Sequence, residues 1–128
     1  MKLTAYAIIN AILCIGYGLS LLIFPAKFVE PYGIILNDHG ILMARGYGTI
    51  LCEVGIIFWF NRNIPGSERI WRIILSASLF YNVVMTAVQI IAITNGVVNS
   101  FTWTTVVFQT IVGAFCIYFL LVGRKNKK

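Results

Sequence analysis

Charged residues are scarce in this chain. They make up 11% of its 128 residues, with Asp and Glu together contributing 4, whereas hydrophobic residues make up 59%. A water-soluble domain normally carries about a quarter charged residues. The chain therefore has too little polar surface for an exterior that faces water throughout, and lipid must cover part of it.

The residue types that build most metal and redox sites are also few. The chain has one histidine and three cysteines, without a Cys-x-x-Cys pair, which argues against a quinone-linked thiol oxidoreductase. Asp38-His39 lacks a third ligand, whereas a zinc or transition-metal site needs three or four. We therefore expect no metal site. Cys14, Cys52 and Cys116 are expected to be buried small side chains.

An enzyme is the least favoured class of function. No nucleophile is paired with a base, so the sequence identifies no catalytic residue, and it does not identify a cofactor. One acid–base scheme stays open, in which Glu53 catalyses an isomerisation and Arg45 is the electrostatic stabiliser.

Long apolar runs, in contrast, are abundant, at about 3–24, 41–60, 70–94 and 102–122. Each reaches the length of about 20 residues that a helix needs to cross a hydrocarbon core. Backbone polar groups in lipid must pair within the segment, so each run is predicted to be helical. The first run is too long for a signal peptide and no cleavage site follows it. The predicted fold is a single domain over 1–128, an all-α integral membrane protein whose four transmembrane helices form an antiparallel bundle.

Basic residues are distributed unevenly around these runs. If the chain crosses four times, eight of them lie on one side of the membrane and Lys27 alone lies in a loop on the other. Lysine and arginine near span ends favour the cytoplasmic side. We therefore expect a multi-pass protein of the inner or plasma membrane with both termini in the cytoplasm. The eight residues are Lys2, Arg62, Arg69, Arg72, Arg124, Lys125, Lys127 and Lys128.

The first loop, Pro25–Gly40, is the longest and is still fairly apolar. Pro25 and Pro31 are expected to break helix continuation. Two interpretations stay open, a connector that lies along the membrane interface and a lid over a cavity.

Short polar residues before three of the runs are expected to cap the helices that follow. Asn37 or Asp38 would cap the second run, Ser67 the third and Ser100 the fourth.

The second run holds both a cation and an anion, Arg45 and Glu53. Each costs at least about 2.5–3.5 kcal/mol at the centre of a span, so a partner must compensate. Their separation of eight residues corresponds to a rise of about 12 Å along a helix, which does not favour a direct ion pair. Each side chain therefore needs partners from other helices.

Polar side chains on the other runs are the candidate partners. They recur at helical spacing and at similar depths, and we expect them to converge on one interior site. That site would bind a ligand or ion, or would only hold the helices together, and both interpretations stay open. The candidate ligand-binding residues are Arg45, Glu53, Asn82, Thr86, Gln89, Gln109, Asn10 and Tyr17.

Small residues form one face on each of the first two runs, and such faces let membrane helices approach closely. We expect the two faces to meet. They consist of Ala7, Ala11, Cys14 and Gly18 on the first run and Ala44, Gly48, Cys52 and Gly55 on the second.

Several short motifs occur along most of the chain: Gly18-Leu19-Ser20-Leu21-Leu22-Ile23-Phe24-Pro25, Tyr32-Gly33, Ala44-Arg45-Gly46 followed by Gly48 and Gly55, and Asn61 after Trp59. Together they resemble small bacterial four-helix membrane proteins of the DoxX-like kind. The resemblance implies a four-helix bundle, a recurring arginine at the start of the second helix, matched here by Arg45, and no established enzymatic activity. Glu53 has no counterpart in that pattern.

Three functions fit these observations. The first is binding of a lipophilic or lipid-like ligand in a polar pocket between the helices, with Arg45 as its anchor. The second is a small homodimeric transporter that uses Glu53 as a coupled carboxylate. The third is an accessory subunit bound to a membrane-protein partner. Membrane lipids are expected partners of the basic tail, and nothing indicates nucleic acid.

Overall fold

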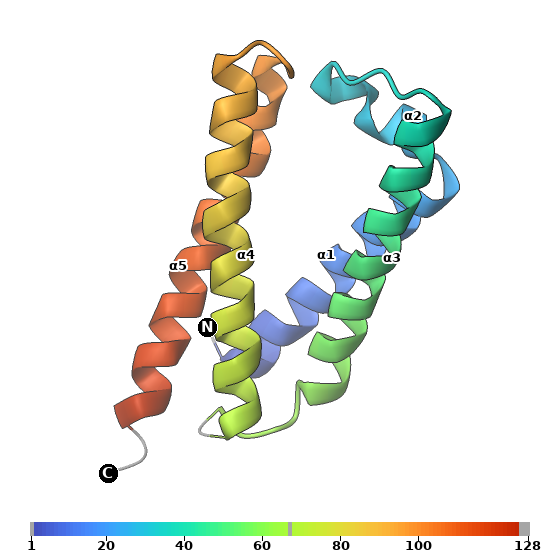
Figure 1. Ribbon diagram of the computed structural model, residues 1–128. Helices are drawn as coiled ribbons and strands as arrows, with labels where there is room; N and C mark the ends of the chain where they lie inside the picture. The colour runs from blue at the N-terminus through green and yellow to red at the C-terminus, as the bar shows by residue number, and fades with distance from the viewer. Residues whose placement is uncertain (1, 67, 126–128) are drawn as a thin grey trace. The chain divides into compact units, whose positions relative to one another are not determined.

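The computed structural model describes residues 2–66 and 68–125, and all regular structure in these ranges is helical (Figure 1). Among the described residues, four helices are long and apolar enough to cross a membrane, as expected for a multi-pass helical membrane protein. The elements are α1 (Leu3–Ile23), α2 (Pro25–Val29), η1 (Glu30–Tyr32), α3 (Asp38–Asn61), α4 (Arg69–Thr94), η2 (Ser100–Thr102) and α5 (Trp103–Lys125), where η denotes a 3₁₀ helix.

Helix capping follows the prediction at one position and departs from it at another. The Oδ1 atom of Asn37 accepts a hydrogen bond from the backbone N–H of Gly40 at 2.8 Å, so α3 begins at Asp38 rather than at Ile41. Ser100 does not cap α5, because it lies inside η2. The cap there is Asn99, whose Oδ1 accepts from the N–H of Phe101 at 3.0 Å.

Two predictions fall on residues outside the described ranges. The proposed cap Ser67 is one of them, and α4 begins after Glu68, whose side chain makes no capping hydrogen bond. The basic residues Lys127 and Lys128 also lie outside these ranges.

The chain divides into two compact units, Met1–Asn63 and Ile64–Lys128, called here the N-terminal and C-terminal units. In the N-terminal unit α1 and α3 pack along each other, with α2 and η1 between them in sequence (Figure 1). In the C-terminal unit the corresponding pair is α4 and α5. Each unit is therefore built on one pair of long apolar helices.

The contact between α1 and α3 is made by small residues. A Cβ atom added to Gly18 would lie 2.6 Å from the Sγ of Cys52, and one added to Gly55 would lie 3.0 Å from the carbonyl oxygen of Ala11. No larger side chain fits at these glycines unless the helices move apart. The predicted meeting of the two small-residue faces is therefore confirmed, and close backbone approach maximises dispersion contacts between the helices.

The first loop is more ordered than a simple connector, because each of its two prolines lies at the start of a short helix. Pro25 occupies the first turn of α2 and Pro31 the first turn of η1, positions that tolerate the missing N–H. Gly33 ends η1 with a φ of 75°, a conformation that glycine adopts without steric cost.

Candidate functional site

Arg45 and Glu53 lie on α3 and are both exposed on the N-terminal unit. Counted from Asp38 at 1.5 Å per residue, they lie about 10 Å and about 22 Å along the helix. Neither side chain forms a hydrogen bond or an ion pair with another described residue. In the described part of the chain, no partner from another helix therefore compensates either charge within this unit.

The two candidates on α1 are satisfied within their own unit. Asn10 is 8% exposed, and its Nδ2 donates to the carbonyl oxygen of Tyr6 at 2.9 Å. The hydroxyl of Tyr17 is hydrogen bonded to the hydroxyl of Tyr32 at 2.5 Å. The Tyr17 ring also packs edge-on against Phe28, with a centroid separation of 4.6 Å. Tyr17 therefore joins α1 to α2 and η1, a role that needs no ligand.

Two of the four candidates of the C-terminal unit, Asn82 and Gln89, lie at the contact between α4 and α5. Asn82 is 7% exposed, and its Nδ2 donates to the carbonyl oxygen of Ser78 at 2.7 Å. Its Cβ is 3.7 Å from a Cβ added to Gly113 on α5. Gln89 accepts a hydrogen bond from the hydroxyl of Thr105 at 3.2 Å, which joins the two helices directly. The polar stripes predicted on these two runs therefore face each other within this unit.

Gln109 and Thr86 differ from Asn82 and Gln89 in their hydrogen bonding. The Oε1 atom of Gln109 is buried without a hydrogen-bond partner among the described residues, and Thr86 is half-buried. A buried acceptor without a donor costs about 1–3 kcal/mol, so such an atom calls for a water molecule, a ligand or another donor. Gln109 is thus the candidate in this unit that has a fully buried acceptor without a hydrogen-bond partner among the described residues.

Within each unit, no hydrogen bond or ion pair joins two of the eight candidate residues in the part of the chain that the structure describes. The convergence of all eight on one interior site stays a prediction. What the structure adds is a division of their roles. Asn10, Tyr17, Asn82 and Gln89 have local partners. The side chains of Arg45, Glu53 and Thr86 and the Oε1 atom of Gln109 have no hydrogen-bond partner among the described residues.

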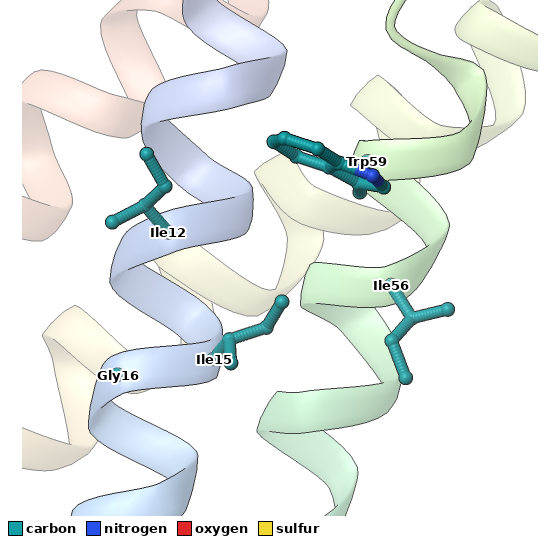
Figure 2. Close-up of a pocket in the computed structure, with 5 residues that line it drawn as sticks. All are labelled: Ile12, Ile15, Gly16, Ile56 and Trp59. Atoms are coloured by element: carbon teal, nitrogen blue, oxygen red, sulfur yellow. The ribbon is translucent and has the colours of Figure 1, made fainter.

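Sequence reasoning missed an apolar groove between α1 and α3, with a volume of about 410 Å³. Figure 2 shows the Trp59 ring and Ile15 pointing into the space between the two helices. A Cβ added to Gly16 would meet nothing within 4 Å, so the groove is open at that residue. In the sequence, the groove is indicated only by the spacing of Ile12, Ile15 and Gly16 on one helix. Their partners on α3 become known only from the helix packing.

Arg62 lies beside this groove, just after α3 ends. Its guanidinium carbon is 4.2 Å from the centroid of the Trp59 ring, and its Nη1 donates to the Trp59 carbonyl oxygen. This cation–π contact fixes a positive charge next to an aromatic ring at one end of the groove.

Comparisons of the chain with protein-family models, with curated proteins and with solved structures give no match. The resemblance to DoxX-like proteins therefore stays a prediction.

Proposed function

We propose that this protein binds a small lipophilic or lipid-like molecule within the membrane, through the charged side chains of α3. The observation that carries the proposal is the guanidinium of Arg45, which is exposed on the apolar helix α3 and has no partner among the described residues. A cation on a membrane-spanning helix is costly unless an acceptor compensates it. A guanidinium presents paired N–H donors that match a carboxylate, a phosphate or a polarised carbonyl group.

The rest of the membrane-spanning surface suits the apolar part of such a molecule. α3 exposes large aliphatic side chains such as Leu42, Met43 and Ile50, at 66%, 73% and 56% of their full area. A ligand with one acidic or carbonyl group and an apolar body would satisfy Arg45 while its body stays in contact with apolar side chains and lipid. Glu53, further along the same helix, would accept a hydrogen bond from a hydroxyl of the ligand or carry a proton itself.

The experiment compares what co-purifies with the protein. The protein is extracted in native-lipid nanodiscs, and bound small molecules are identified by native mass spectrometry and by analysis of solvent extracts. We expect a stoichiometric molecule with the unsubstituted protein and its loss in Arg45→Gln. Lys27→Gln, which removes an exposed cation from α2 of the same unit, is the matched control and should retain it. Equal extracts from all three proteins would contradict the proposal.

A second candidate function is that of a homodimeric transporter. In it, the carboxylate of Glu53 would couple transport to the movement of a proton or another cation. Its support is that the carboxylate is exposed on α3 without a partner among the described residues. Proton-driven flux in proteoliposomes that disappears in Glu53→Gln would favour this function, and flux that is unaffected would remove it. A stoichiometric membrane protein recovered with the chain would instead favour an accessory subunit.

The topology that we propose with this function is an antiparallel four-helix bundle of the inner or plasma membrane with both termini in the cytoplasm. It is supported by the charge distribution, because Lys2, Arg62, Arg69 and Arg72 flank span ends that would share one side.

A further inference from the structure

We infer that the groove between α1 and α3 holds one acyl chain of an anionic phospholipid, whose phosphate is bound at Arg62. This site is separate from the proposed ligand site at Arg45. It rests on the lining of the groove, its position along α3 and the charge at its end.

The lining suits a hydrocarbon chain. The five residues are Ile12, Ile15, Gly16, Ile56 and Trp59, and none of their side chains presents a charged group or a hydrogen-bond acceptor. Figure 2 shows these residues on two adjacent helices, and Gly16 leaves space that a side chain would otherwise fill. Dispersion contacts favour an occupant that fills this space with apolar atoms.

The position of the groove matches the depth of a phospholipid. Trp59 and Arg62 lie at the end of α3, and tryptophan and arginine at span ends lie at the membrane–water interface. Ile15 contacts the position of Gly55, which precedes Arg62 by about 10 Å of helix rise. The groove thus runs from headgroup level into the hydrocarbon region, whichever side of the membrane this end of α3 occupies.

The charge at the end of the groove selects the headgroup. Among the described residues Arg62 forms no ion pair with a carboxylate, and its contacts with Trp59 leave other guanidinium N–H groups free to donate. The chain carries a net charge of +6 with Asp and Glu contributing only 4 residues, so a second copy of it is poorly suited to supply the missing anion. An anionic phospholipid supplies both, because its phosphate carries the negative charge and its acyl chain fills the groove.

The test uses the fluorescence of Trp59, whose ring lines the groove. The protein is reconstituted in vesicles that contain phosphatidylglycerol or phosphatidylcholine with brominated acyl chains, which quench tryptophan on contact. The signal of interest is the part of the quenching that Trp59→Phe removes. We expect an about fivefold preference for phosphatidylglycerol over phosphatidylcholine, since one arginine near an anionic surface contributes about 1 kcal/mol.

Two pairs of variants distinguish the binding of the acyl chain from the recognition of the headgroup. Gly16→Leu fills the groove and should reduce quenching by both lipids, whereas Gly46→Leu, at the other glycine on a long helix where an added Cβ meets nothing within 4 Å, should not. Arg62→Gln should abolish the preference for phosphatidylglycerol, and Arg62→Lys should keep it.

Three results would overturn the inference. Equal quenching by the two lipids in the unsubstituted protein would mean contact with surrounding lipid without headgroup selection. Absence of quenching by either lipid would mean that protein covers the groove. Equal quenching in Gly16→Leu and Gly46→Leu would mean that the acyl chain does not lie at Gly16. Arg45→Gln should leave this signal unchanged, so failure here and failure of the proposed function are distinguishable.

Discussion

Gly18 and Gly48 face each other across the contact of α1 and α3: a Cβ added to either residue would lie 2.6 Å from the carbonyl oxygen of the other. The relationship is reciprocal, so neither helix can carry a side chain at this point unless the backbones separate. The two helices therefore approach closely because both residues lack a side chain, and not because a large side chain of one helix fits into the other.

We expect Gly18→Ala and Gly48→Ala each to destabilise the N-terminal unit by about 1–3 kcal/mol, the usual cost of overpacking a tight contact. The matched controls are Gly16→Ala and Gly46→Ala, where an added Cβ meets nothing within 4 Å. These should be neutral or stabilising by up to about 1 kcal/mol, because alanine favours the helix over glycine. Unfolding of the protein in mixed detergent micelles measures all four, and equal losses in the two pairs would refute the close contact.

The hydroxyl pair of Tyr17 and Tyr32 is expected to hold the first loop against α1. Tyr17→Phe keeps the ring contact with Phe28 and removes only the hydrogen bond, which contributes about 0.5–1.5 kcal/mol. Hydrogen exchange should then become faster in α2 and η1 and stay unchanged in the middle of α1. Tyr17→Ala removes both contacts and should have the larger effect. Unchanged exchange in both variants would show that other contacts hold the loop.

The polar residues between α4 and α5 should respond to substitution in opposite directions. Thr105→Val removes the hydroxyl that donates to Gln89 at 3.2 Å and to the carbonyl oxygen of Thr102 at 2.7 Å, and it should cost about 0.6 kcal/mol, a typical value between membrane helices. Gln109→Leu removes a buried acceptor that has no partner among the described residues, so stability should stay equal or rise. Detergent unfolding measures both. A large loss in Gln109→Leu would reveal a donor bound to this amide in the native protein.

The charge distribution predicts which loops face the cytoplasm. Alkaline phosphatase, which is active only outside the cytoplasm, should be active when inserted at Gly96 in the third loop and inactive when fused to the C-terminus. A green fluorescent protein fused to the C-terminus should be fluorescent. The reversed pattern would show that the basic residues Arg62, Arg69 and Arg72 do not set the orientation.

The sequence by itself determined the features that depend on local interactions. Four apolar runs became helices because hydrocarbon length and backbone pairing are properties of each segment alone. Asn37 capped α3 because its side chain reaches an N–H three residues ahead. The small-residue faces were visible because they repeat with the helical period. At the start of the fourth run the same local reasoning chose Ser100, whereas the side chain that caps the short helix η2 there is that of Asn99.

Tertiary structure decided everything that depends on two segments meeting. The periodicity of α1 shows Ile12, Ile15 and Gly16 on neighbouring positions, but only the register against Ile56 and Trp59 turns them into a groove. Tyr17 was predicted from the sequence as a candidate ligand-binding residue, and only the packing of the first loop shows that the hydroxyl of Tyr32 lies within hydrogen-bond distance of its own. The physical reason is that the energies of membrane insertion and of helix capping depend on one segment alone. Grooves and hydrogen bonds between helices depend instead on how two helices cross. At the contact of α1 and α3, a few small residues such as Gly18 and Gly48 allow that crossing.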